Sequence, residues 1–179
     1  MEELIEEIDW NEKIVAIRPK SELRKKMFPH RAALVIPRAA GEKFLLCRRA
    51  ADKQPFPDTW CCAVGGKVMA GESYEKAAQR EMLEEIGLVQ PLERVASFKY
   101  DGDDYKAVFA LFTTEKPLAV EKCSLDAGEI QYLAEFSIPE IRKMVEEQPQ
   151  EFAPTFRVAL IAFAENLPKT ASLKKGKLA

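Results

Sequence analysis

The stretch that decides how this chain folds runs from residue 65 to residue 88 and reads GGKVMAGESYEKAAQREMLEEIGL. A serine suited to cap a helix and a glycine suited to end one predict a helix over residues 73–87. At about 100° per residue, Glu81, Glu84 and Glu85 fall within one arc of this helix. Like charges at this spacing destabilise a helix by roughly 0.2–0.5 kcal/mol per pair, so the cluster needs an explanation.

Two interpretations compete for this acidic patch. The first is a solvated helix face, which is common on protein surfaces. The second is a site for a hard divalent cation, because Mg2+ and Mn2+ prefer carboxylate and carbonyl oxygens. Met82 and Ile86 lie on another side of the helix and can face a core, and the patch lies next to the segment entered through Gly65 and Gly66.

The spacing of the surrounding residues favours the second interpretation. The order is Gly66, five residues, Glu72, seven residues, and then Arg80, Glu81, Met82, Leu83, Glu84, Glu85, Ile86, Gly87 and Leu88. This order matches G-x5-E-x7-R-E-U-x-E-E-x-G-U, in which U is aliphatic, at every position. The segment therefore resembles the Nudix box, the signature of the Nudix hydrolases.

The resemblance implies a metal site and a role for each residue. The groups that it assigns to one or more Mg2+ ions, or Mn2+, are Glu81, Glu84, Glu85 and the carbonyl of Gly65. Glu72 reaches the metal through water or braces the loop, and Arg80 orients the carboxylates through charge-assisted hydrogen bonds. Either Glu84 or Glu81 is the general base that takes a proton from water.

The implied activity is metal-dependent hydrolysis of a diphosphate linkage, and a nucleoside diphosphate or its derivative is the expected substrate. Four basic residues around the expected mouth of the site are candidates for phosphate contacts: Arg48, Arg49, Lys53 and Lys67. Four acids outside the box are weaker candidates for a catalytic role, because solvated turn acids are common: Asp101, Asp103, Asp104 and Glu129.

The flanks resemble a branch of the family that looks like isopentenyl-diphosphate isomerase. When the chain is aligned on Pro57-x-x-Trp60, the cysteine that the isomerases need falls on Gly65 and their histidine falls on Lys67. The only histidine here is His30, which is expected to be structural or on the surface. Isomerase activity is therefore disfavoured. A non-catalytic nucleotide-binding module on the same fold stays open as an alternative, although such modules typically lose box acids.

Composition limits the remaining possibilities. The chain has 179 residues and a formal net charge of -2, so no broad basic field indicates nucleic-acid binding. The acidic N-terminus does not resemble a signal peptide, and no apolar run reaches the ~18 residues that span a membrane, which predicts a cytoplasmic protein. The four cysteines have no zinc-site spacing and are expected to be reduced. The sequence does not decide between a monomer and a homodimer.

The order of elements predicts the fold class. Strands are expected over 13–19, 32–38, 44–49, 61–64, 92–100, 106–114 and 130–137, and helices over 21–27, 73–87, 137–145 and 154–166. The strands over 32–38 and 44–49 are expected to pair as a hairpin. This order predicts an α/β sandwich with a mixed sheet between helices, the arrangement that the resemblance also implies. One domain is expected over residues 1–166, with 1–30 as its N-terminal extension and 167–179 as a disordered basic tail.

Overall fold

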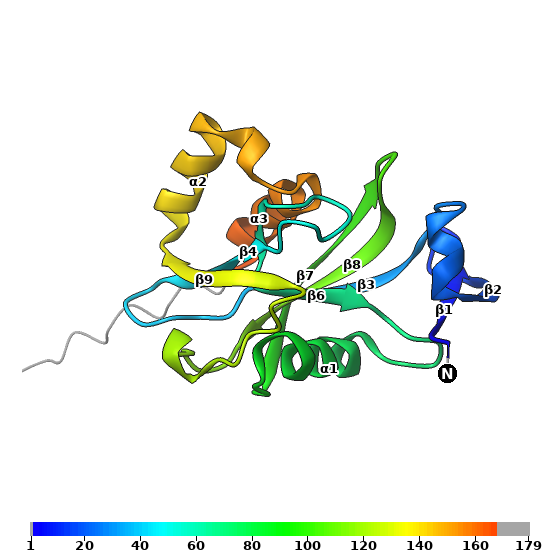
Figure 1. Cartoon of the computed structure of the whole chain (residues 1–179), viewed down its shortest axis with the longest axis horizontal. Helices are drawn as coiled ribbons and strands as arrows, with labels where there is room; N and C mark the ends of the chain where they lie inside the picture. The colour runs from blue at the N-terminus through cyan, green and yellow to red at the C-terminus, as the bar shows by residue number, and fades with distance from the viewer. Residues whose placement is uncertain (1, 168–179) are drawn as a thin grey trace, which may run out of the picture.

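The computed structural model of the chain describes residues 2–167 (Figure 1). The elements in chain order are β1 (Leu4–Ile8), β2 (Ile14–Pro19), the 3-10 helix η1 (Lys20–Arg24), β3 (His30–Val35), β4 (Phe44–Arg49), β5 (Trp60–Cys62), β6 (Val64–Lys67), α1 (Tyr74–Ile86), β7 (Leu92–Asp101), β8 (Lys106–Thr114), η2 (Val120–Lys122), β9 (Ile130–Phe136), α2 (Ile138–Glu147), η3 (Pro149–Glu151) and α3 (Pro154–Asn166).

The strands form two sheets. The larger sheet has the order β2-β1-β3-β8-β7, and β6 pairs with β3. Its central pair, β3 with β8, is parallel, and the other pairs are antiparallel. The smaller sheet has the antiparallel order β5-β4-β9. The predicted mixed sheet is therefore confirmed.

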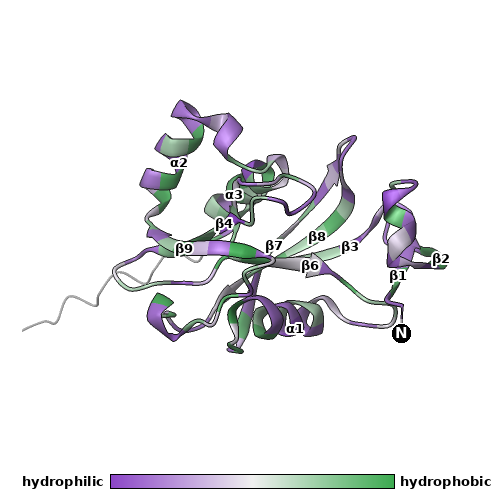
Figure 2. Ribbon diagram, viewed as in Figure 1, coloured by the Kyte–Doolittle hydropathy of each residue, from purple (hydrophilic) through white to green (hydrophobic). Residues whose placement is uncertain are grey.

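Helices cover both sides of the larger sheet, as predicted. α1 packs against β6 and β3, whereas α3 packs against β7 and β5 (Figure 1). The central strand β8 is almost continuously apolar, and its residues from Ala107 to Thr114 are buried, as expected for a strand covered on both faces. Figure 2 shows this hydrophobic stretch in the middle of the molecule, while the peripheral α2 is mostly hydrophilic.

The predicted hairpin of residues 32–38 and 44–49 is wrong. The chain does reverse around Gly41, which has φ +65°, and the Ala39 amide donates to the Lys43 carbonyl over 2.7 Å. Beyond an isolated bridge between Arg38 and Phe44, however, β3 and β4 enter different sheets. The reason is that β3 is buried along most of its length and takes the central place beside β8, where both of its faces are covered.

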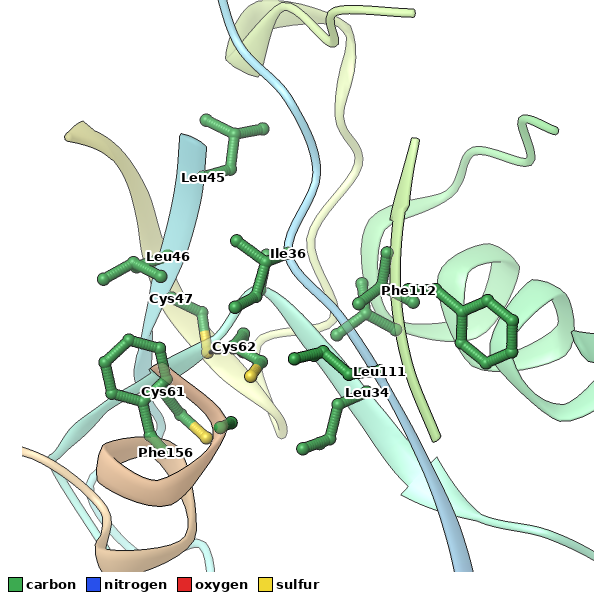
Figure 3. Close-up of a cluster of buried hydrophobic side chains, with 14 of the residues drawn as sticks. Leu34, Ile36, Leu45, Leu46, Cys47, Cys61, Cys62, Leu111, Phe112 and Phe156 are labelled. Carbon is green, nitrogen blue, oxygen red and sulfur yellow. Dashed lines mark hydrogen bonds between the residues drawn. The ribbon is translucent and has the colours of Figure 1, made fainter. Parts of the chain in front are cut away.

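The predicted strand over 61–64 is also divided between the sheets. β5 pairs with β4, and β6 pairs with β3, so Ala63 lies where the chain crosses from one sheet to the other. The core lies between these sheets and the helices. Figure 3 shows side chains such as Leu34, Cys47 and Phe156 meeting in this core. All four cysteines are free thiols, as expected.

The N-terminal region contains a strand that the sequence did not indicate. β1 pairs with β2 and reaches β3 through Glu7 and His30. Ile5, Leu23 and Phe28 form a small separate core beneath it. The short helix expected over 21–27 is a 3-10 helix that begins one residue earlier and ends at Arg24.

The predicted helix boundaries agree well with the structure. Ser73 caps α1 by accepting from the Lys76 amide, and Gly87 ends it in the left-handed conformation with φ +70°. Ser137 begins α2 with a capping box. No helix among residues 2–167 is long and apolar enough to cross a membrane. The expected disordered tail lies outside the described residues, apart from Leu167.

Candidate active site

The two most buried carboxylates of α1 face strand β6. Glu81 and Glu85 are one helical turn apart and are only 8% and 7% exposed. The Gly65 amide donates to Glu85 Oε2 over 3.1 Å. A Cβ atom at Gly66 would lie 2.0 Å from the Glu81 carboxyl, so only glycine allows α1 to approach the strand this closely.

Arg80 joins the polar residues of the box. Its guanidinium donates to both oxygens of Glu72 over 3.1 Å, to Glu81 Oε1 over 2.6 Å and to Glu84 Oε2 over 3.3 Å. It also donates to the carbonyl of Lys67 over 3.0 Å. Such charge-assisted bonds fix carboxylate orientation. The arrangement agrees with the orienting role expected for Arg80 and with Glu72 bracing the loop.

The electrostatics of the two buried acids differ. Burial raises the pKa of Glu85 well above its usual range, and the nearby Glu81 raises it further. Burial also raises the pKa of Glu81, but the hydrogen bond and charge of Arg80 oppose this shift. Both acids are therefore destabilised as anions by desolvation, and a cation beside them would relieve that penalty.

These carboxylates open onto a cavity of about 1200 Å3. Its charged lining includes Glu81, Glu85, Glu129, Arg49, Lys53 and Lys67. Its apolar lining includes Leu23, Met27, Ala32, Leu34, Phe56 and Phe109. The cavity therefore combines an acidic and basic region with an apolar wall, as suits a ligand that carries both an anionic and an organic part.

The expected metal ligands are only partly brought together. Glu81, Glu85 and Gly65 line the cavity, whereas Glu84 does not, and its half-exposed side chain bonds to Arg80. Within residues 2–167, no group of three or more His, Cys, Asp or Glu side chains converges as a metal centre. The oxygen donors at the cavity are still of the kind that a hard cation prefers. They are buried carboxylates, whose negative charge is poorly solvated by water.

Three of the four expected substrate contacts line the cavity. Arg49 donates to the carbonyls of Pro55 and Phe56, and Lys53 pairs with Glu129. Lys67 lies 5.6 Å from the centre of the Tyr105 ring. Burial lowers the pKa of Lys67 to about 8, and the positive charges of Lys20, Lys53 and Arg49 lower it further. Several cations therefore lie near one another around the cavity.

Arg48 points elsewhere. Its guanidinium pairs with Asp58 and Glu151 at 2.8 Å and lies 5.9 Å from the Trp60 ring centre. It is absent from the cavity lining, so the substrate role expected for Arg48 has no support in this arrangement. Trp60 itself packs against Tyr132 and Phe136.

The weaker acidic candidates divide in the same way. Glu129 and Asp104 line the cavity, whereas Asp101 and Asp103 do not. His30 is fully buried, and its Nδ1 lies 3.0 Å from the Phe28 carbonyl, so the expected structural role is consistent with its position. It does not line the cavity.

Strand β1 braces the loop that carries Glu72. Ile5 forms a bridge with Met69, and the Ala70 amide donates to the Leu4 carbonyl over 2.8 Å. The buried Glu6 accepts from the Gly71 amide over 2.9 Å. These bonds tie the N-terminal strand to the middle of the Nudix-like motif.

Arg31 extends this bracing. It donates to Glu6 Oε2 over 2.7 Å and to the Glu72 carbonyl over 2.9 Å. A continuous chain of polar contacts therefore runs from Glu6 through Arg31, Glu72 and Arg80 to Glu81.

No sequence motif indicated that the N-terminal region would reach the site. The cavity residues that it contributes are Glu2, Glu3, Lys20, Ser21, Leu23, Arg24 and Met27. Tyr105 and Phe109 were also missed. No local motif marks the residues of η1 as part of a site, because the pairing of β1 with β2 determines where they lie. The two aromatic residues lie in an apolar strand context that looks like ordinary core.

Comparison with known proteins identifies the class. A family model described as NUDIX domain matches residues 28–156. With the fold and the box geometry described above, this shows that the chain belongs to the Nudix family and is a Nudix hydrolase.

Individual relatives share most or part of the chain. A Methanosarcina mazei protein named prenyl-diphosphate phosphatase is 28% identical over 162 residues, which cover 88% of this chain and 93% of the relative. An isopentenyl-diphosphate Delta-isomerase 2 from Photorhabdus laumondii is 31% identical over 100 residues, or 56% of each chain. The resemblance of the flanks to the isomerase branch is therefore confirmed.

The solved structures agree on the fold. The crystal structure of DR0079 from Deinococcus radiodurans superposes with a TM-score of 0.76 and covers 90% of this chain and 99% of its own. At 16% identity, this likeness concerns the fold alone.

Proposed function

We propose that this Nudix hydrolase cleaves the diphosphate linkage of an organic diphosphate, with Mg2+ or Mn2+ held at Glu81, Glu85 and the carbonyl of Gly65. One observation carries the proposal. Two buried carboxylates, each with a raised pKa, face the same cavity as the cationic Lys67. The cavity thus offers acidic oxygen ligands for a cation beside an ammonium group for a phosphate.

A divalent cation at this position would neutralise phosphate oxygens and make a water molecule more acidic. The residues of the chain would hold the cation and bind the substrate. Glu81 and Glu85 fix the position of the cation, and Arg80 holds Glu81 through the 2.6 Å contact. Lys67 binds a phosphate oxygen of the substrate.

Glu81 is the better of the two candidates for the general base. Its carboxylate lines the cavity, whereas that of Glu84 lies outside the lining and is half exposed. A general base must come within hydrogen-bond reach of the water that it deprotonates. We therefore assign the proton transfer to Glu81 and a supporting contact with Arg80 to Glu84.

A nucleoside diphosphate, or a derivative of one, is the first candidate substrate. The aromatic residue Phe56 lines the cavity, and an aromatic ring can stack on a base. The cavity volume of about 1200 Å3 exceeds what a diphosphate alone requires.

A prenyl diphosphate is the second candidate, and a specific observation favours it. Leu23, Met27 and Leu34 join Phe109 in the cavity lining and would suit an apolar chain. The Methanosarcina mazei relative, which matches along most of both chains, carries the name of a prenyl-diphosphate phosphatase. Both candidates present the same diphosphate to Glu81 and Lys67.

The two other interpretations are weaker. An isomerase of the related branch needs a cysteine and a histidine where this chain has Gly65 and Lys67. A non-catalytic binding module does not explain why every box acid is present.

The test is phosphate release from a panel that holds nucleoside di- and triphosphates, prenyl diphosphates, nucleotide sugars and dinucleotides. The wild type would be compared with Glu85→Gln, and with Glu75→Gln as a matched exposed acid on the same helix. We expect Mg2+-dependent turnover that falls at least about a hundredfold in Glu85→Gln and not in Glu75→Gln. Equal turnover in all three proteins would contradict the proposed metal site.

A further inference from the structure

The N-terminal segment, residues 2–27, forms one wall of the active-site cavity. This segment precedes the matched Nudix domain, which begins at residue 28. It contains β1, β2 and η1, and it places Lys20, Ser21 and Arg24 in the cavity lining. The substrate cavity is therefore completed by residues that lie outside the family match.

Lys20 is held firmly at the start of η1. Its backbone amide donates to the Glu3 carbonyl over 2.8 Å, and its ammonium pairs with the carboxylate of Glu3, the residue just before β1. This ion pair is exposed, because the two side chains are 39% and 51% accessible. Exposed pairs contribute little free energy, so the ammonium can exchange Glu3 for a stronger anionic partner at low cost.

Lys20 lines the same cavity as Lys67, Glu81 and Glu85. Lys67 lies on β6, next to Gly66, while Lys20 approaches from the N-terminal segment. Two lysines from separate elements therefore line one cavity.

Two other cations of the cavity, Lys53 and Arg49, are more strongly engaged. Lys53 pairs with Glu129, and Arg49 donates to two backbone carbonyls of the loop that carries Phe56. Among the ion pairs of residues 2–167, none involves Lys67, whose nearest recorded partner is the Tyr105 ring. Lys67, which has no ion pair within that range, and Lys20, whose ion pair is exposed, can thus bind a new anion, and the exposed Arg24 is a further cation of the lining.

We propose that Lys20 binds the diphosphate of the substrate together with Lys67, so that the N-terminal segment is part of the substrate site. The proposal rests on the proposed function of this cavity. A phosphate that reaches both ammonium groups gains a charge-assisted hydrogen bond to each. Lys20 would then determine affinity for the diphosphate and leave the chemical step to the α1 carboxylates.

Two measurements on four variants test the proposal. The variants are Lys20→Gln, Lys20→Arg, Glu3→Gln and Lys13→Gln, the last being an exposed lysine of the same segment outside the cavity lining. The first measurement is calorimetric binding of inorganic diphosphate, with Mg2+ and with EDTA. The second is the separation of KM from kcat on the best substrate of the panel.

We expect Lys20→Gln to weaken diphosphate binding and raise KM about tenfold while kcat changes less than about twofold. Lys20→Arg should restore most of the affinity, because it keeps the charge. Glu3→Gln should bind as tightly as the wild type or more tightly, since it frees the ammonium of Lys20. Lys13→Gln should behave like the wild type.

Equal binding by Lys20→Gln and Lys13→Gln would overturn the proposal. An equal loss in Glu3→Gln and Lys20→Gln would also overturn it, because the effect would then come from loosening the segment. If the wild type hydrolyses no diphosphate, the proposed function fails. The calorimetric comparison still decides whether Lys20 binds this anion.

Discussion

Arg80 Nη1 lies 2.6 Å from Glu81 Oε1, and this contact gives the two buried carboxylates of α1 different surroundings. Glu81 has a guanidinium partner, whereas Glu85 has the Gly65 amide as its recorded partner in the described chain. Their proximity raises the pKa of Glu85 further above its usual range. The site therefore carries an acid pair in which Glu81 is compensated by a guanidinium and Glu85 is not.

Arg80→Lys tests the orienting network. Lysine keeps the charge but loses the planar fork that contacts Glu72 and Glu81 together. We expect kcat to fall about 10- to 100-fold, with a loss of about 1–2 kcal/mol in the free energy of unfolding. Urea denaturation and steady-state kinetics measure the two effects. Arg142→Lys, an exposed change on α2, is the control, and an equal outcome for both variants would refute the orienting role.

Gly66→Ala tests the close approach of α1 to β6. The new Cβ would lie 2.0 Å from the Glu81 carboxyl, so the carboxylate must move out of its present position. We expect activity to fall at least about a hundredfold, because an error of about 1 Å in a catalytic group has this effect.

The control for this substitution is Gly41→Ala. Gly41 has φ +65° and no atom within 4 Å of an added Cβ, so alanine should lower stability by about 1 kcal/mol through backbone strain. Its kcat should not change. Activity in Gly66→Ala close to that of Gly41→Ala would show that the position of Glu81 is not critical.

Glu85→Gln should stabilise the protein when no cation is present. The folded-state pKa of Glu85 is raised, so its contribution to stability is present below the unfolded pKa near 4.5 and is lost as pH rises. In EDTA at pH 7, the variant should melt at least about 3 °C higher, and this difference should vanish near pH 4.

Added Mg2+ should reverse the order of stability. The wild type should gain stability with Mg2+ concentration, since ligand binding favours the folded state, and Glu85→Gln should not. Differential scanning calorimetry gives both comparisons. An equal response of both proteins to Mg2+ would argue against Glu85 as a ligand.

His30 should make the protein sensitive to acid. Burial lowers the pKa of its imidazole to about 4 from 6.5, and Nε2 has no hydrogen-bond partner. The unfolded chain therefore binds the proton first as pH falls, and stability declines between about pH 6.5 and 4 by about 3 kcal/mol.

The slope of stability against pH isolates this effect. His30 is the only histidine, so the difference in slope between the wild type and His30→Gln over this range reports it alone. The absolute stability of the variant does not enter the comparison. Parallel curves for the two proteins would show that His30 does not titrate with a lowered pKa.

Local signals explain which parts of the fold could be predicted. Ser73 and Gly87 bound α1 because capping depends on neighbouring residues, and the box spacing places Arg80 beside Glu81 within the same helix. The start of α2 was predicted within a residue, and its capping box likewise uses only neighbouring residues. These features need no knowledge of the rest of the chain.

Long-range pairing explains what the sequence did not show. The separation of β3 and β4 depends on β8, some 75 residues further along the chain, which takes the place beside β3. The position of Lys20 depends on β1, a short strand whose sequence resembles an ordinary acidic terminus. The outward direction of Arg48 depends on Glu151, near the other end of the chain. No pattern of neighbouring residues predicts these long-range contacts.

The most direct test of the central claim is Mn2+ binding followed by electron paramagnetic resonance, without substrate. The wild type, Glu81→Gln, Glu85→Gln and Glu75→Gln would be titrated at pH 7.5. We predict that the wild type and Glu75→Gln bind Mn2+ alike and that the other two bind at least about tenfold more weakly. Equal affinity in all four proteins would mean that Glu81 and Glu85 do not hold the cation.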